Sequence, residues 1–247
     1  MIAFARSLAL LAALALPTAR ASAAPTGDDV VNDVQKFYGG VNQVTALFRE
    51  YVTYKQFGTT TSSDGKLYLQ KPGKMRWDYL EKVKGETRYK RSFISDGTTL
   101  WLVEHDKKQV TKKSLAQTVM PVAVSFLYGK GDLKTEFNAA LDTSGTYGAK
   151  GDRVVKLTPK QPSAQYKTLT LVVASDDGHV RESIIVDSSD NVTHFKFFSP
   201  DFKAPIDQKV FEFNRDSARN YRVFDADQAG SAAQQAPAPP PAPAKKP

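Results

Sequence analysis

Residues 28–43 carry apolar side chains at the spacing of an α-helix. Four of them follow one another at steps of four, three and four residues: Val30, Val34, Phe37 and Val41. Such spacing places all four on one face of a helix, so a surface helix with a buried face is expected. Thr26 or Asp28 can cap its first turn, because each offers a side-chain oxygen to the unpaired backbone N–H groups.

Beyond Val44 the apolar period shortens to two, which is the spacing of β-strands. Runs rich in Val, Thr, Tyr and Phe recur at 47–57, 66–70, 74–80, 87–94, 99–104, 109–113, 135–141, 153–157, 167–174, 180–186, 192–199 and 210–213. Turn sequences such as Asp-Gly and Pro-Gly separate many of them, which predicts an antiparallel meander. A sheet of about eleven strands should curl and so acquire a concave face.

Residues 114–127 interrupt the strands and return to the helical period. The apolar positions in this stretch are Leu115, Val119, Val122, Phe126 and Leu127. Pro121 should divide the stretch into two short helices, and Gly129 and Gly131 end it. The expected fold class is therefore α+β, an incomplete antiparallel β-barrel with helices that cover the concave apolar face.

The two ends of the chain do not have the pattern of a fold. Residues 1–23 combine Arg6, an apolar run and the sequence Ala21-Ser22-Ala23, which predicts a secretory signal peptide cleaved near Ala23. The run is too short for a transmembrane anchor, the alternative interpretation. Residues 226–247 are rich in Ala and Pro and predict a disordered tail. One domain, 24–225, remains, and a periplasmic location is expected.

Charge and cysteine content exclude several functions. The whole chain has 34 Lys+Arg, 26 Asp+Glu and no cysteine, for a formal net charge of +8. Four of the basic residues and one acidic residue lie outside 24–225, so the domain itself is only modestly basic. Because its charges are interspersed and the protein is exported, nucleic-acid binding is not expected. The lack of cysteine excludes disulfides, thiol catalysis, Cys-based metal sites and lipidation of the mature N-terminus.

Catalytic motifs are also absent. The sequence contains no G-x-S-x-G, H-E-x-x-H or P-loop pattern. Its three histidines, His105, His179 and His194, fall in two turns and one strand and are expected at the surface. The sequence therefore predicts a protein that is not an enzyme and that needs no cofactor or metal.

Three motifs occur in an informative order. Residues 65–77 read G-x-L-x-L-x-K-P-G-K-M-R-W, residues 95–101 read S-D-G-x-x-L-W, and Gln109-Val110 follows. This ordered set resembles the outer-membrane lipoprotein carrier protein (LolA) family, and the similarity extends over most of residues 30–223. The resemblance implies an incomplete barrel whose helices form a lid over a hydrophobic cavity for lipoprotein acyl chains. It also implies a monomeric carrier that receives cargo from a LolCDE-type ABC transporter and delivers it, in many cases, to a LolB-type receptor. LolB shares the fold but is lipidated, so the absence of cysteine argues against LolB.

Strand alternation nominates the first five of the residues expected to line the cavity, and the resemblance implies the other five. They are Leu67, Leu69, Met75, Trp77, Tyr79, Phe93, Ile94, Val119, Val122 and Phe126. Lys71 occupies the basic position that, by the resemblance, latches lid and barrel together. Two alternatives stay open: alternating apolar residues form the core of any half-buried sheet, and the same scaffold could bind or sense another lipid or amphiphile.

Overall fold

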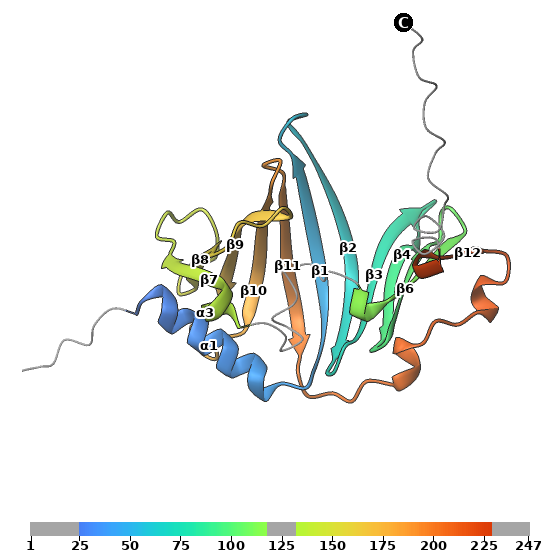
Figure 1. Ribbon diagram of the computed structural model, residues 1–247, viewed down its shortest axis with the longest axis horizontal. Helices are drawn as coiled ribbons and strands as arrows, with labels where there is room; N and C mark the ends of the chain where they lie inside the picture. The colour runs from blue at the N-terminus through green and yellow to red at the C-terminus, as the bar shows by residue number, and fades with distance from the viewer. Residues whose placement is uncertain (1–24, 118–131, 229–247) are drawn as a thin grey trace, which may run out of the picture.

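The computed structural model describes residues 25–117 and 132–228, and these residues form one twelve-stranded sheet with a long N-terminal helix (Figure 1). The helical elements are α1 (Gly27–Gly40), η1 (Leu115–Gln117), α3 (Leu133–Glu136), η3 (Gln208–Phe211) and η4 (Asp216–Ala218). The strands are β1 (Gln43–Tyr54), β2 (Thr59–Gln70), β3 (Lys74–Val83), β4 (Glu86–Asp96), β5 (Thr99–Glu104), β6 (Gln109–Ser114), β7 (Phe137–Leu141), β8 (Arg153–Pro159), β9 (Tyr166–Val173), β10 (Val180–Asp187), β11 (Val192–Asp201) and β12 (Arg222–Asp225).

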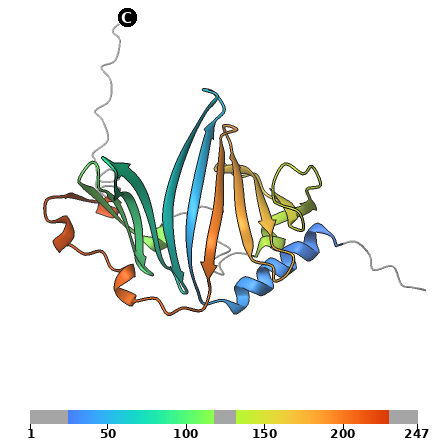
Figure 2. The ribbon, with the colours of Figure 1, turned by 180° about the vertical axis from the view of Figure 1, so that it is seen from behind.

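Two antiparallel meanders make up the sheet. Strands β1 to β6 form the first and β7 to β11 the second, and β1 pairs with β11 to join them. The order is β12-β6-β5-β4-β3-β2-β1-β11-β10-β9-β8-β7, with β12 and β7 unpaired with each other, so the sheet is open. Figures 1 and 2 show that it curves across its width. The expected incomplete antiparallel barrel is confirmed.

Helix α1 confirms the helix expected near the N-terminus. Thr26 caps it in a capping box: its hydroxyl accepts from the Asp29 N–H, and its own N–H donates to the Asp29 carboxylate. The helix ends at Gly40, earlier than the apolar period suggested, because two successive glycines favour leaving the helix. Four larger side chains are buried against the sheet: Val30, Val31, Val34 and Tyr38. The helix lies against β7 and β8, which places it over the second meander (Figure 1).

The C-terminal part of the chain differs from the prediction. Residues 210–213 were expected to form a strand, but none of them does, and the first two belong to the 3-10 helix η3. Asp207 starts this helix by accepting a hydrogen bond from the Lys209 N–H, and Phe211 is buried at 1% exposure. A strand forms later instead, as β12, which pairs with β6 in parallel. Four residues of alternating apolarity are too few to distinguish a strand from a helical turn.

The boundary of the predicted tail also moves. The Ser114 N–H donates to the Asp227 carboxylate at 2.7 Å, so the chain still contacts the sheet beyond residue 225. The predicted signal peptide 1–23 and most of the tail lie outside the described residues. In the part of the chain that is described, no helix has the length and apolarity to cross a bilayer.

Two apolar clusters lie on opposite faces of the sheet. The large one fills the concave face and receives α1, and β3 contributes Met75, Trp77 and Tyr79 to it. The small one, around Val103 and Val110, lies on the convex face under the C-terminal segment. Successive residues of a strand point to opposite faces, so β4 and β5 contribute to both clusters: Phe93 and Leu100 to the large one, Ile94 and Val103 to the small one.

Candidate functional site

Aromatic rings gather at the centre of the concave face. The Phe48 ring lies 5.2 Å from the Trp77 ring and 5.0 Å from the Tyr79 ring, centroid to centroid. Phe195 lies 5.6 Å from Trp77 and stacks on Phe197 at 6.2 Å. These rings come from β1, β3 and β11, so the junction of the two meanders forms the middle of the cluster. Such a surface offers extensive apolar area and few polar groups, which suits a hydrocarbon ligand.

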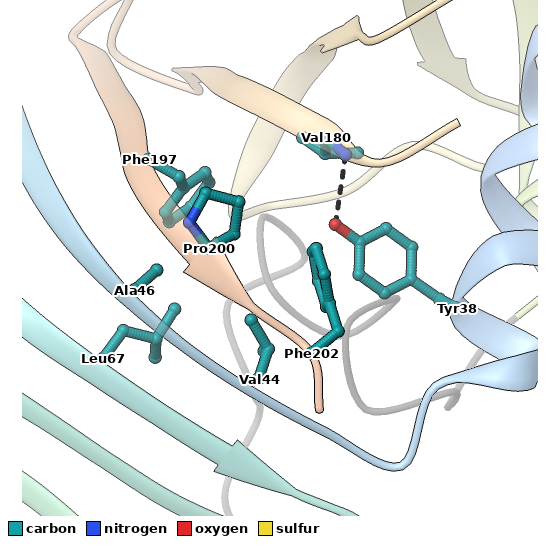
Figure 3. Close-up of a pocket in the computed structure, with 8 residues that line it drawn as sticks. All are labelled: Tyr38, Val44, Ala46, Leu67, Val180, Phe197, Pro200 and Phe202. Atoms are coloured by element: carbon teal, nitrogen blue, oxygen red, sulfur yellow. Dashed lines mark hydrogen bonds between the residues drawn. The ribbon is translucent and has the colours of Figure 1, made fainter. Parts of the chain in front are cut away.

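A pocket opens beside this cluster, between the end of α1 and the sheet (Figure 3). It is lined by Tyr38, Val44, Ala46, Leu67, Val180, Phe197, Pro200 and Phe202. Its cavity volume is about 20 Å³, roughly what one water molecule needs. An acyl chain can therefore enter only if the lining moves, and Figure 3 shows Tyr38 and Phe202 on the side of the pocket nearest α1.

Five predicted cavity residues lie in the concave cluster. Leu67, Leu69, Met75, Trp77 and Tyr79 are all buried there, and Leu67 also lines the pocket. Phe93 is half-buried and packs against the same cluster, with its ring 6.0 Å from that of Tyr79. The structure thus brings these six side chains onto one face, which is compatible with the expected cavity.

Ile94 does not belong to this face. It pairs with Arg76 across β3 and β4, whereas Phe93 pairs with Trp77. Ile94 is therefore on the convex face, where it packs with Val103 and Val110. Adjacent residues of a regular strand cannot both face the cavity, so the expectation for Ile94 is corrected. The three remaining candidates, Val119, Val122 and Phe126, lie outside the described residues.

Lys71 joins the sheet to helix α1. Its Nζ donates to the backbone carbonyl oxygen of Tyr38 in the last turn of the helix, and its N–H donates to the Asn42 carbonyl oxygen at 2.8 Å. A cation at the C-terminal end of a helix is favourable because the last carbonyls carry partial negative charge. Desolvation lowers the pKa of Lys71 below its ordinary value. The residue thus ties α1 to the β2–β3 turn. Most of the lid segment predicted at 114–127, which Lys71 was expected to latch, lies outside the described residues.

We expect Lys71→Met to loosen this end of α1. The variant keeps an aliphatic stem but cannot donate to the Tyr38 carbonyl, so the free energy of unfolding should fall by about 1 kcal/mol. Amide hydrogen exchange near Tyr38 should accelerate, and binding of an acyl chain should strengthen because the pocket opens more easily. Lys66→Met is the matched control, since Lys66 is exposed on the convex side of β2, the strand that leads into this turn. Equal exchange rates in the two variants would contradict the role assigned to Lys71.

Several residues of the site were missed from the sequence. Phe195 and Phe197 alternate within β11 as cavity-facing residues should, so the period of two could have identified them. Phe48 could have been found in the same way. Tyr38 and Phe202 could not, because only the packing of α1 and of the chain after β11 brings them to the pocket.

The convex face carries a polar network that resembles a catalytic constellation only in composition. The Ser92 hydroxyl donates to Asp78 at 2.6 Å and lies 3.3 Å from His105 Nε2, while His105 Nδ1 lies 3.2 Å from the Tyr221 hydroxyl. Ser92 is completely buried, so no substrate reaches its hydroxyl. The network ties the C-terminal segment to the sheet, and burial lowers the pKa of His105.

The histidines are less exposed than expected. All three are half-buried, and each has a polar partner: His179 Nδ1 lies 2.6 Å from Asp177, and His194 Nε2 lies 2.6 Å from Glu182. Asp176, Asp177 and His179 could together approach a metal ion, but both acids are exposed and occupy a turn. None of the three histidines lines the pocket.

Together these features define an open half-barrel with an apolar concave face and a helix-flanked pocket. A family model described as "Outer membrane lipoprotein carrier protein LolA" matches residues 39–214. The chain belongs to the LolA family.

Curated relatives carry the same description. A protein from Methylococcus capsulatus named outer-membrane lipoprotein carrier protein is 29% identical over 152 residues, which are 62% of this chain and 67% of that protein. One of the same name from Methylobacillus flagellatus is 26% identical over 185 residues, 75% and 84% of the two chains.

The matches among solved structures are more distant. A LolA superfamily protein from Nitrosomonas europaea has a TM-score of 0.40 and 11% identity, covering 77% of this chain and 99% of that one. The lipoprotein LppX from Mycobacterium tuberculosis has a TM-score of 0.44 and 14% identity, covering 72% and 96%. At these TM-scores neither structure adds weight to the family assignment, which rests on the sequence match.

Proposed function

We propose that this protein is a periplasmic carrier that holds the acyl chains of lipoproteins against its concave face and moves them from the inner to the outer membrane. The observation that carries the proposal is the continuous apolar cluster on the concave face, with a pocket beside it, in a chain of the LolA family. The carrier binds without catalysis and uses no cofactor.

The energetics of acyl chains explain why such a surface is needed. Each buried CH2 group is stabilised by about 0.8 kcal/mol, so a multiply acylated anchor resists leaving a bilayer by tens of kcal/mol. A soluble carrier can hold the chains only by offering comparable apolar area. The extraction itself must be driven by a donor, which we propose to be a LolCDE-type ABC transporter, and a LolB-type receptor would accept the cargo.

Because the pocket is small, the side chains that line it must move before an acyl chain can enter. A pocket of about 20 Å³ does not hold an acyl chain, so loading requires Tyr38 and Phe202 to move away from β1 and β2. We propose that the closed arrangement protects the apolar face while the carrier is empty. Processing near Ala23 would release a monomeric domain, and residues 229–247 would act as a spacer.

Release of acylated lipoprotein from inner-membrane spheroplasts tests the carrier function. Addition of the purified protein should transfer radiolabelled lipoprotein to the soluble fraction as a stoichiometric complex. A cargo variant whose lipidated cysteine is replaced by serine is the control, since it has no acyl chains to protect. If the protein binds acylated cargo in detergent but releases none from membranes, the alternative of a lipid- or amphiphile-sensing module is supported instead.

A further inference from the structure

A charged residue interrupts the apolar concave face. Glu50 follows Phe48 on the same side of β1 and is buried, with only 9% of its side chain exposed. The Tyr79 hydroxyl donates to Glu50 Oε1 at 3.3 Å, and Arg91 Nη2 donates to Oε2 at 3.3 Å. The Arg91 guanidinium also lies 4.0 Å from the centre of the Tyr79 ring. We call Glu50, Tyr79 and Arg91 the polar cluster.

The polar cluster marks the limit of the apolar surface. Ala46 lines the pocket, and Glu50 lies four residues further along β1, about 13 Å away. Beyond Glu50 the paired strand β2 becomes exposed and polar: residues 59–62 are Thr-Thr-Thr-Ser, and all four are exposed. An amphiphile whose tail occupies the pocket region and extends along β1 can place its polar end near the polar cluster.

Arg91 has the chemistry to contact that polar end. A guanidinium has five N–H donors, and 41% of the Arg91 side chain remains exposed, so a ligand can reach it. Its ring contact with Tyr79 and its ion pair with Glu50 hold it over the edge of the apolar surface. A fixed guanidinium of this kind donates well to oxygen acceptors.

The charge of Glu50 selects among such acceptors. Its carboxylate already balances the charge of Arg91, and the next carboxylate or phosphate to approach would meet its repulsion. Burial raises the pKa of Glu50, although the charge of Arg91 opposes the change. The pair is close to neutral as a unit, which favours an uncharged acceptor such as an ester carbonyl over a phosphate group.

We propose that Arg91, positioned by Glu50 and Tyr79, donates hydrogen bonds to the ester carbonyl oxygens of a diacylglyceryl group, while Glu50 disfavours anionic phospholipid headgroups. This inference rests on the proposed function and identifies the part of the lipoprotein that the carrier recognises. The apolar face alone would accept any hydrocarbon chain, so Arg91 would favour diacyl esters and Glu50 would favour the uncharged lipoprotein anchor over an anionic phospholipid.

Two synthetic lipopeptides test the inference. One carries an S-dipalmitoylglyceryl cysteine, with two ester carbonyls, and the other is its diether analogue, with chains of the same length but no ester carbonyl. The full-length mature protein should bind the diester about tenfold more tightly, since the carbonyls accept hydrogen bonds from a charged donor. Arg91→Met should abolish the preference, and Arg91→Lys should retain part of it because a cationic donor remains.

One further variant serves as a control, and another tests the role of the Glu50 charge. Arg88→Met removes an exposed arginine of the same strand, which pairs with Glu86, and should leave the preference intact. Glu50→Gln keeps the shape and the acceptor for Tyr79 but removes the charge. It should raise binding of dipalmitoyl phosphatidylglycerol several-fold relative to binding of the diester, and an unchanged ratio would overturn the role of Glu50.

The outcomes separate the two proposals. Equal binding of diester and diether by the wild-type protein would overturn the inference and leave the carrier function standing. A preference that survives in both Arg91 variants would also overturn it. Failure of the wild-type protein to bind either lipopeptide would contradict the carrier function itself.

Discussion

Replacing Gly65 with alanine should lower the free energy of unfolding by about 3 kcal/mol or more. Gly65 pairs directly with Phe48 in β1 and with Tyr79 in β3, and the Phe48 ring lies over it. A Cβ at this position would overlap the ring and the backbone carbonyl oxygen of Asp78. The ring could rotate away only into its aromatic neighbours, and the carbonyl is fixed in the sheet. Steric overlap thus explains why the G-x-L-x-L motif begins with glycine: no larger residue fits at position 65.

Urea denaturation followed by circular dichroism measures this effect. Gly39→Ala is the matched control, because a Cβ on Gly39 meets nothing within 4 Å and Gly39 lies in helix α1. That variant should be unchanged or more stable by about 0.5–1 kcal/mol, since alanine favours the helix. If Gly65→Ala had wild-type stability, Phe48 would be able to repack freely. The aromatic cluster on the concave face would then not be rigid.

Trp77→Ala should greatly weaken acyl-chain binding. Trp77 contacts Phe48, Phe195 and Phe197 at the centre of the concave face, so its removal takes away the largest apolar surface there. Loss of contact with about three CH2 groups of a bound chain would reduce affinity roughly 50-fold. The cavity left behind should also lower the free energy of unfolding by about 3–5 kcal/mol.

The chain offers a matched control in its second tryptophan. Trp101 is half-buried on the convex face, where it stacks on Phe213 with ring centres 6.0 Å apart. Trp101→Ala should destabilise the protein without changing affinity for the diester lipopeptide. Titration below the unfolding temperature of both variants separates binding from stability. A similar loss of affinity in the two variants would show that Trp77 acts through stability alone.

The sequence predicted the strands better than it predicted the site. A period of two and explicit turns are local signals, and they were sufficient for an open antiparallel sheet and for helix α1. They were not sufficient for residues 210–213, because a four-residue apolar pattern fits a 3-10 turn that buries Phe211 as well as it fits a strand. They also missed β12, whose partner β6 lies more than a hundred residues earlier in the chain.

The errors in the site have a different origin. Ile94 was assigned beside Phe93 by the resemblance, although strand alternation places neighbours on opposite faces. Glu50 carries no sequence signal, because a carboxylate that is buried looks the same in a sequence as one that is exposed. The pocket depends on Tyr38, Val180 and Phe202, which only tertiary packing brings together.

Tyr38 gives one further consequence. Its carbonyl oxygen accepts from Lys71, its hydroxyl accepts from the Val180 N–H at 3.1 Å, and its ring lines the pocket (Figure 3). Ligand entry and helix attachment therefore act on the same residue, and thermodynamic linkage makes their effects reciprocal. If loss of the Lys71 contact strengthens acyl-chain binding by some factor, a bound chain weakens that contact by the same factor. Loaded and empty protein are then expected to differ at the C-terminal end of α1, where a partner can distinguish them without touching the cargo.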